Sequence, residues 1–228
     1  MGMTIEQIRK MLSEAQPDDS NYIASGLITK NDIGEEVPYQ IFLGLDPIRA
    51  NNCDNYWGAF NLTLIDFIVN SNFTPEELKL IEDDIQLDDH HWDWLLKSGK
   101  YHSEEYKWFF LDAEGDTQAI CMIYHPKRSE LDDGDIFYIE YVAVAPWNRN
   151  NPLQPKKYSG VGSLIIKAAM DYAINTLGLR YGFSLHALPK AMGFYQKIGM
   201  IRLQHLDKET LSFFEMPEDG AKKYMGLS

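Results

Sequence analysis

The sequence predicts an α+β protein with one mixed, mostly antiparallel sheet flanked by helices. Strand-like apolar runs at 106–112 and 117–124 are joined by a tight polar turn, and a third such run follows at 136–144. A glycine-led helical segment at 160–173 and a short strand-like run at 181–185 come next. Three consecutive strands, followed by a helix and further strands, are typical of a sheet with helices packed against it.

The other elements have their own signals. Thr4 and Thr74 stand where helix N-caps are expected, and Pro75 is favoured at a first helical position. An apolar face with helical spacing is formed by Trp57, Phe60, Leu64, Phe67 and Ile68. The elements expected outside the central part are a helix over 4–15, strands over 22–29 and 37–45, helices over 55–70 and from 74, a late helix over 190–198, and a hairpin of 201–206 with 210–215.

The composition is that of a soluble protein able to bury a substantial core. The chain has 228 residues, of which 45% are hydrophobic, and no apolar run approaches the ~20 residues of a membrane span. No charged and then apolar leader opens the sequence, so we expect a cytoplasmic protein. The formal net charge of −13 argues against nucleic acid and anionic membranes as partners, because both would repel the protein.

Neither the cysteines nor the histidines indicate a metal site. Cys53 and Cys121 are too few for a disulfide framework and lack metal-ligand spacing, so we expect buried free thiols. His90 and His91 are adjacent, and adjacent side chains do not face each other on a helix. We therefore expect no metal, and we interpret this segment as a partly buried aromatic cluster.

The start of the glycine-led helix has the features of an anion site. Gly160 and Gly162 remove side chains from the backbone, and the first amides of a helix have no acceptor within it. These amides and the helix dipole suit a phosphate, although such a glycine pair also serves as a packing or turn device. A P-loop is excluded because Ser163 and Leu164 follow, and a dinucleotide fingerprint is excluded because Ile165 is too large.

Three segments carry a pattern that goes beyond the glycines. They read Val-Ala-Val-Ala-Pro at 142–146, Lys-Tyr-Ser-Gly-Val-Gly at 157–162 and Ala-Met-Gly-Phe-Tyr-Gln-Lys-Ile-Gly-Met at 191–200. In this order they resemble the GNAT family of N-acetyltransferases, which transfer acyl groups from acyl-coenzyme A. The resemblance covers roughly residues 106–214.

The resemblance implies a GNAT-like fold in a single domain over residues 1–228. In that fold two neighbouring strands of the sheet part to admit the cofactor. The implied parts are an N-terminal extension at 1–34, acceptor-side helices at 35–105 and an acetyl-CoA-binding core at 106–216, with an extended acidic N-terminal part.

Acetyl-CoA is the co-substrate that the resemblance implies. The backbone of the strand would hold its pantetheine arm through Val142, Ala143 and Val144. The pyrophosphate would lie against the residues around the glycines, which are Lys157, Tyr158, Ser159, Gly160, Val161 and Gly162. The family has a basic residue before its glycines. Counted back from Gly160 this residue is Lys157, and counted forward from Pro146 it is Arg149, and both alternatives stay open.

Amide formation from a thioester needs a base for the amine and an acid for the leaving thiolate. Glu140 lies on an otherwise apolar strand, and it is interpreted either as the general base or as a structural residue paired in the core. Tyr195 occupies the position where the family often places the acid. Tyr138, on the same strand face as Glu140, is a second candidate for holding the amine or its water. His186, at the end of the next strand, is an alternative acid or base.

The function that these features predict is acetylation of a primary amine by direct attack in a ternary complex. The acidic excess lies before Gly134, which favours a cationic acceptor, either a small molecule or a basic peptide terminus. Trp92 and Trp94 are candidates for lining its pocket, since cationic amines favour indole faces. A homodimer is left open. The alternative is a non-catalytic coenzyme A binding or partner-binding protein with the same fold.

Overall fold

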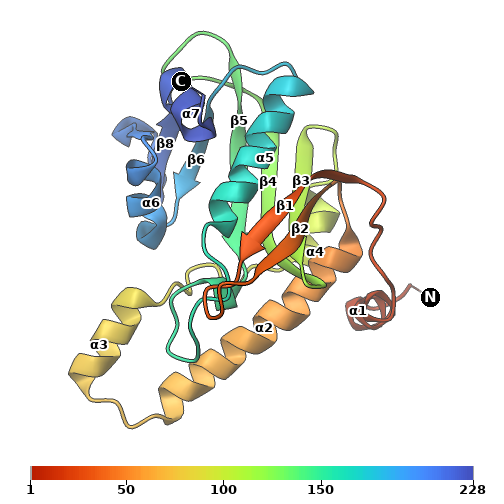
Figure 1. Cartoon of the computed structure of the whole chain (residues 1–228), viewed down its shortest axis with the longest axis vertical. Helices are drawn as coiled ribbons and strands as arrows, with labels where there is room; N and C mark the ends of the chain where they lie inside the picture. The colour runs from red at the N-terminus through yellow and green to blue at the C-terminus, as the bar shows by residue number, and fades with distance from the viewer. Residues whose placement is uncertain (1, 228) are drawn as a thin grey trace. The chain divides into compact units, whose positions relative to one another are not determined.

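The computed structural model describes residues 2–227, apart from the side chain of Asp83. It has one eight-stranded sheet in the order β1-β2-β3-β4-β5-β6-β8-β7, flanked by helices (Figure 1), which confirms the predicted α+β class. The strands are β1 (Tyr22–Thr29), β2 (Glu36–Leu43), β3 (Tyr106–Ala113), β4 (Asp116–Arg128), β5 (Asp135–Val144), β6 (Phe183–Ala187), β7 (Ile201–Arg202) and β8 (Ser212–Met216). The helices are α1 (Ile5–Ser13), α2 (Pro47–Asn70), α3 (Pro75–Asp84), α4 (Trp94–Lys100), α5 (Val161–Asn175), α6 (Met192–Lys197) and α7 (Glu218–Met225).

The chain divides into two compact units, and β5 begins in the second and ends in the first. Unit 1 consists of Met1–His102, Phe110–Ile120 and Ala143–Val161. Unit 2 consists of Ser103–Phe109, Cys121–Val142 and Gly162–Ser228. The single domain implied by the resemblance, with its parts at 1–34, 35–105 and 106–216, stays a prediction.

In unit 1, the helix α2 begins earlier than its apolar periodicity predicts. Its first residue is Pro47 rather than a residue near position 55. Asp46 caps the helix, because its Oδ1 accepts hydrogen bonds from the N–H groups of Ile48 at 2.9 Å and Arg49 at 3.0 Å. The extra turns carry polar residues that interrupt the apolar pattern, and this is why the pattern places the start too late.

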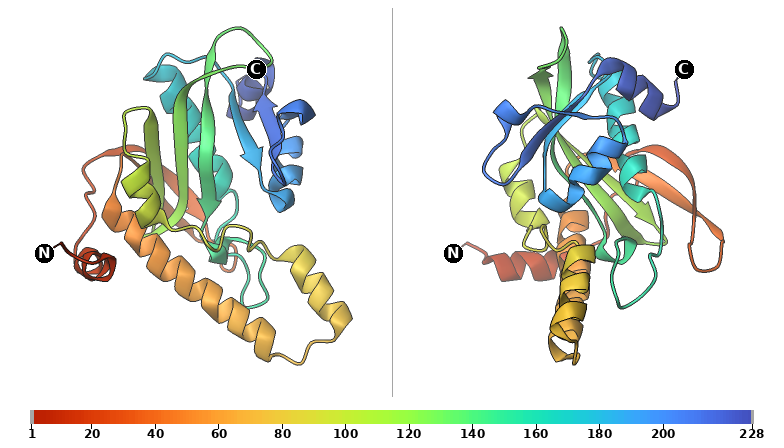
Figure 2. Two further views of the ribbon diagram at one scale, coloured as in Figure 1. Left: turned by 180° about the vertical axis from the view of Figure 1, so that it is seen from behind. Right: turned by 90° about the vertical axis from the view of Figure 1, so that its left-hand side faces the viewer.

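The apolar face predicted for α2 is buried only in part. Trp57 and Leu64 are buried, whereas Phe67 near the end of the helix is 37% exposed. Its ring packs on Phe73 in the connection to α3, with ring centroids 5.8 Å apart, and Figure 2 shows α2 leading into that connection. Although α2 has 24 residues, no helix within 2–227 combines the length and apolar character needed to cross a bilayer.

The two threonine N-caps of unit 1 are confirmed. Thr4 precedes α1 and Thr74 precedes α3, and each hydroxyl accepts from the N–H of the third helical residue. The side chains of those residues, Gln7 and Glu77, bond back to the threonine N–H groups at 2.9 and 2.8 Å.

In unit 2, the elements after α5 differ from the sequence expectation at their ends. The strand β6 begins at Phe183, two residues later than expected, because Gly182 has a φ of +138° and packs against the Met216 carbonyl. The final hairpin keeps only two residues in β7. The helix α7, which follows Pro217 and has acidic residues in its first turn, was not expected from the sequence.

Candidate functional site

The strands β5 and β6 pair in parallel over three positions, the last of which joins Ile139 to Leu185. Beyond that pair β5 continues to Val144, whereas β6 ends at Ala187 and pairs with β8 along its other edge. Within the described residues the two strands therefore part after Ile139. The edge of β5 beyond this point is not bonded to β6, and such an edge can offer N–H and C=O groups to an extended ligand.

The helix α5 begins at Val161, directly after Gly160. Gly160 has a φ of +78°, in the left-handed region where a residue with a side chain is strained. An added Cβ would meet nothing within 4 Å, so the backbone turn requires this glycine and crowding does not. Ser159 and Gly160 are exposed, and the first N–H groups of any helix lack an internal acceptor, so this helix start suits an anion.

The loop that precedes α5 is held by internal bonds of unit 1. Tyr158 is fully buried, its hydroxyl donates to Glu114 Oε2 at 2.6 Å, and its N–H donates to Asn148 Oδ1 at 3.0 Å. Lys30 and Lys157 pair with the same Glu114 carboxylate, with Nζ–O distances of 2.5 and 3.1 Å. Lys30, then Tyr158 and Lys157, lower the pKa of Glu114 to about 2, so the carboxylate remains ionised.

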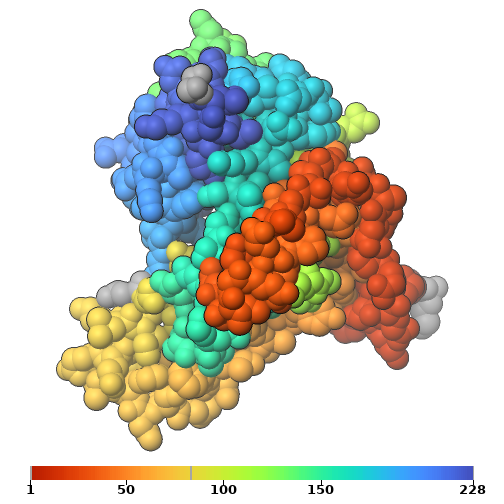
Figure 3. All heavy atoms as spheres, in the orientation of Figure 1, coloured from red at the N-terminus to blue at the C-terminus, as the bar shows by residue number. Residues whose placement is uncertain are grey.

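Hydrogen bonds from the turn between β1 and β2 hold this loop in place. The N–H of Asn31 donates to the Lys157 carbonyl at 3.0 Å. Asn31 Nδ2 donates to the Lys156 carbonyl at 2.9 Å and to Ser159 Oγ at 3.0 Å. Figure 3 shows the β1–β2 turn lying against the loop. Nothing in the sequence links Asn31 to a loop more than a hundred residues away, so sequence reasoning missed it.

Both candidate cations for the pyrophosphate form ion pairs in unit 1. The guanidinium of Arg149 bonds the Asp89 carboxylate through Nη1 at 2.5 Å and Nη2 at 2.6 Å. Its Nε and Nη2 also donate to the Val144 carbonyl at 2.9 and 2.7 Å. The Arg149 side chain is 11% exposed and that of Lys157 is 31% exposed, so Lys157 is the better placed of the two to meet an anion from solvent.

Glu140 lies on a half-buried face of β5 together with Tyr138 and Val142. On the opposite face Ile139 and Ala143 are buried. Burial, and then the charge of Glu140, raise the pKa of Tyr138. Glu140 and Tyr138 are therefore close enough to interact.

Two further candidates from the sequence, Tyr138 and His186, are brought together in unit 2. The Tyr138 hydroxyl lies 2.6 Å from His186 Nδ1. Tyr195 of α6 is buried beside Phe194 and Phe214, with ring centroids at 5.3 and 6.2 Å. Burial raises the pKa of Tyr195 above that of a free phenol, so its hydroxyl is protonated at neutral pH and is a weaker acid than a free phenol.

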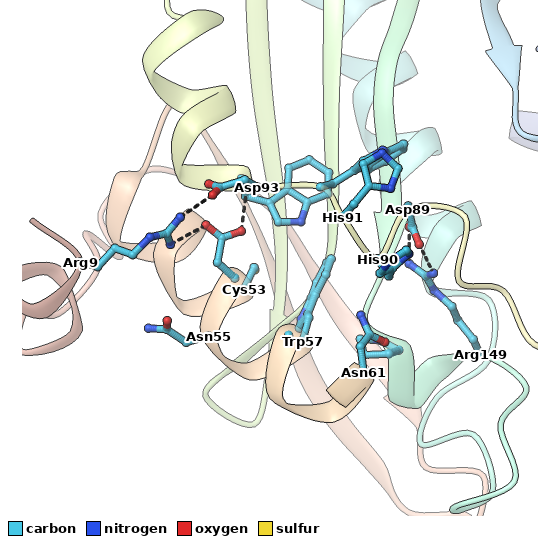
Figure 4. Close-up of a pocket in the computed structure, with 15 residues that line it drawn as sticks. Arg9, Cys53, Asn55, Trp57, Asn61, Asp89, His90, His91, Asp93 and Arg149 are labelled. Carbon is cyan, nitrogen blue, oxygen red and sulfur yellow. Dashed lines mark hydrogen bonds and ion pairs between the residues drawn. The ribbon is translucent and has the colours of Figure 1, made fainter. Parts of the chain in front are cut away.

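A pocket of about 360 Å³ lies in unit 1 (Figure 4). One part of its wall is aromatic and consists of Trp57, Trp92 and Trp94. Trp94 meets the other two indoles edge to face, with ring centroids 6.1 Å from Trp57 and 5.6 Å from Trp92. His90 and His91 add two imidazole rings. The segment interpreted from the sequence as an aromatic cluster thus lines a pocket.

Ion pairs form another part of the pocket wall (Figure 4). Arg9 bonds Asp54 at 2.9 Å and Asp93 at 2.6 Å on one side, and the Arg149–Asp89 pair stands on the other. Three carboxylates face two guanidiniums, so the lining has a net negative charge. Sequence reasoning missed Arg9 and Asp54, because residues 45 positions apart give no joint signal.

The two cysteines are free and buried, as expected from the sequence. Burial raises the pKa of both the Cys53 and the Cys121 thiols, so neither is activated as a thiolate nucleophile. Across the part of the chain that the structure describes, no three His, Cys, Asp or Glu side chains are grouped to hold a metal ion.

Comparison with solved structures gives several acetyltransferases. The N-acetyltransferase PseH of Campylobacter jejuni has a TM-score of 0.39 and 14% identity, over 64% of this chain and 93% of that chain. A GNAT acetyltransferase of Streptococcus pneumoniae has a TM-score of 0.39 and 14% identity, over 77% and 96% of the two chains. An uncharacterized Bacillus halodurans protein has a TM-score of 0.48 and 9% identity, over 90% and 96%.

The chain is similar in structure to GNAT acetyltransferases. No protein-family model and no curated protein matches its sequence. At these identities the similarity concerns the fold alone.

Proposed function

We propose that this protein is an acetyl-CoA-dependent N-acetyltransferase that acts on a primary amine in a ternary complex. The observation that carries the proposal is the parting of β5 from β6 after Ile139 and Leu185. The parting leaves an edge of β5 for an extended thioester arm, and the glycine-led start of α5 supplies an anion site shortly after it in the chain.

The donor would be held mainly by backbone groups. Val142, Ala143 and Val144 would bond the pantetheine arm, and an N–H of this segment would polarise the thioester carbonyl. The diphosphate would meet the amides of Gly160, Val161 and Gly162 and the side chain of Lys157, with Tyr158 and Ser159 shaping the loop. The support for this assignment is the +78° φ of Gly160 and the set of bonds that fixes the loop.

The acyl transfer then follows from two proton-handling side chains. Glu140 takes a proton from the ammonium form of the acceptor, and the free amine nitrogen attacks the thioester carbonyl carbon. The C–N bond forms, the C–S bond breaks, and the Tyr195 hydroxyl gives its proton to the leaving thiolate. The half-buried place of Glu140 supports its role, and the position of Tyr195 in the 191–200 segment supports the other.

The acceptor would be a cationic amine bound in the tryptophan-lined pocket of unit 1. The pocket volume of about 360 Å³ suits a small molecule or the end of a peptide. Indole faces and a net negative lining favour a cation over an anion. Arg149 lines the pocket and also bonds the carbonyl of Val144, the last residue of β5, so the pocket lies next to the end of that strand.

The experiment that tests the proposal measures thiol release from acetyl-CoA in the presence of a panel of amines. We expect turnover with at least one cationic primary amine and none with its N-acetylated or neutral analogue, and mass spectrometry should show a product heavier by one acetyl group. Binding of coenzyme A without turnover on any amine would instead support the alternative, a non-catalytic coenzyme A binding protein.

Trp92→Ala should raise KM for the amine about tenfold and leave KM for acetyl-CoA unchanged, because it removes one indole face from the acceptor pocket. Steady-state kinetics with each substrate varied in turn checks this. Leu62→Ala is the matched control, since Leu62 is on α2, 69% exposed and outside the pocket lining. Equal KM values for Trp92→Ala and the control would place the acceptor elsewhere.

Asn31→Ala should weaken binding of coenzyme A about tenfold with a change in melting temperature of only a few degrees, because it frees the loop before α5 without exposing core. Calorimetric titration of coenzyme A and a thermal melt check both parts. Asp32→Ala, in the same turn, is the control. An unchanged Kd for Asn31→Ala would mean that the hydrogen bonds of Asn31 to the loop before α5 do not shape the donor site.

A further inference from the structure

Tyr138 and His186 form a hydrogen-bonded dyad in unit 2. The Tyr138 hydroxyl lies 2.6 Å from His186 Nδ1, and His186 Nε2 lies 3.0 Å from the carbonyl oxygen of Leu206. A carbonyl oxygen only accepts hydrogen bonds, so Nε2 carries the imidazole proton. In the neutral ring Nδ1 is then the acceptor, and the Tyr138 hydroxyl donates to it. The lone pairs of the phenolic oxygen remain to accept a second hydrogen bond.

The surroundings of the dyad favour the neutral imidazole at rest. Burial is the main cause that lowers the pKa of His186, and Lys208 adds to it, while the Leu206 carbonyl and Asp207 act in the opposite direction. The ring packs edge to face on Phe213 of β8, with centroids 5.1 Å apart. The groups facing it from β5, β8 and the segment after Leu206 thus leave a neutral base whose Nδ1 lone pair accepts from Tyr138.

The place of the dyad in the sheet is next to Glu140. Tyr138 pairs in register with Ser184 of β6, so Tyr138, Ser184 and His186 share the face on which Glu140 lies. Tyr138 and Glu140 are two residues apart on β5, so their side chains are neighbours on this face. One strand face therefore carries two separate groups that can take a proton.

The chemistry of a cationic acceptor needs two such groups. An ammonium ion must lose one proton to become a nucleophile, and the nitrogen must lose a second proton once it has bonded to the carbonyl carbon. A single carboxylate that has taken the first proton cannot take the second before it returns the first to solvent. The proposed function assigns Glu140 only the first of these two steps.

We propose, resting on that function, that Tyr138 and His186 are a proton relay that takes the second proton. As the tetrahedral adduct collapses, the proton on nitrogen moves to the Tyr138 oxygen while the Tyr138 proton moves to His186 Nδ1. The C–S bond breaks, and Tyr195 protonates the thiolate. The imidazolium, held through Nε2–H by the Leu206 carbonyl, and protonated Glu140 then release their protons to solvent, and solvent reprotonates Tyr195. One acetyl group is transferred and one net proton is released.

Two substitutions separate a relay from a structural contact. Tyr138→Phe removes the hydroxyl, and His186→Asn keeps an acceptor near the Nδ1 position that cannot take up a proton. We expect each to lower kcat about 100-fold with KM for acetyl-CoA unchanged, and we expect the remaining activity to rise with pH more steeply than that of the wild type. His102→Asn, an exposed histidine of unit 1, should change none of these values.

A spectroscopic readout keeps the relay testable without turnover. Imidazole ¹⁵N signals should show His186 as the neutral Nε2–H tautomer at neutral pH, and Tyr138→Phe should shift its Nδ1 signal. A protonated ring or the Nδ1–H tautomer would overturn the proposal, as would kcat within about twofold of wild type for both variants. If the wild type binds coenzyme A but acetylates no amine, the proposed function fails, and the tautomer and shift alone decide whether the dyad has the form a relay needs.

Discussion

Glu140→Gln is expected to lower kcat by about 10²–10⁴-fold and to leave the affinity for coenzyme A unchanged. A glutamine keeps the shape of the side chain but cannot take a proton from the ammonium group of the acceptor. Steady-state kinetics and a calorimetric titration of coenzyme A measure both effects.

The control for this prediction is Glu104→Gln, an exposed carboxylate of unit 2. It should behave as the wild type in every measurement. The structural interpretation of Glu140 makes the opposite prediction, which is a lower melting temperature with kcat nearly unchanged. A variant that is less stable but equally active would therefore remove Glu140 from the mechanism.

Arg49→Met should lower the free energy of unfolding by about 3–5 kcal/mol, the cost of leaving buried charges without their partner. The Arg49 side chain is 2% exposed, and it bonds Asp112 at 2.8 Å and Asp46 at 2.6 Å while its guanidinium stacks on Phe42. Methionine fills a similar volume but leaves both carboxylates without their cation. Urea denaturation of the two proteins at neutral pH measures the difference.

The pH dependence of this loss has a definite sign. Burial already raises the pKa of Asp112, while the hydrogen bonds of Thr117 and Arg49 lower it. Without Arg49 this pKa should rise further, so protonation relieves the charge and the deficit should shrink as the pH falls toward 4. The control is Arg128→Met, because the Arg128–Asp133 pair is largely exposed and should contribute less than about 1 kcal/mol. A deficit that is the same at both pH values would contradict the buried-charge explanation.

Features that depend on residues close together in the chain could be predicted from the sequence. The caps at Thr4 and Thr74, the β3–β4 hairpin and the glycine-led start of α5 each depend on residues within a few positions of one another. Local physics decides them, since a cap or a left-handed glycine acts on its own backbone. The same holds for the shared face of Tyr138 and Glu140, which follows from the two-residue period of a strand.

Features that join distant segments could not be predicted. Some interactions join residues that become neighbours only in the folded chain. They are the hydrogen bonds of Asn31, the Arg9–Asp54 ion pair and the Arg149–Asp89 ion pair. The fully buried side chain of Tyr158 is another case, because its aromatic ring and polar hydroxyl fit equally well in a binding loop or in a core. The ion pairs of Arg9 and Arg149 line the pocket of unit 1, so this part of its wall was found only in the structure, whereas Trp92 and Trp94 were candidates from the sequence.

The measurement that tests the central claim most directly is a calorimetric titration of coenzyme A into the wild-type protein and into Gly160→Glu. The amides at the start of α5 are proposed to bind a diphosphate, so the wild type should give saturable heat. The variant, with a strained backbone and a negative side chain at φ +78°, should give none while keeping its circular dichroism spectrum. No heat with the wild type, or the same affinity in both proteins, would contradict the account.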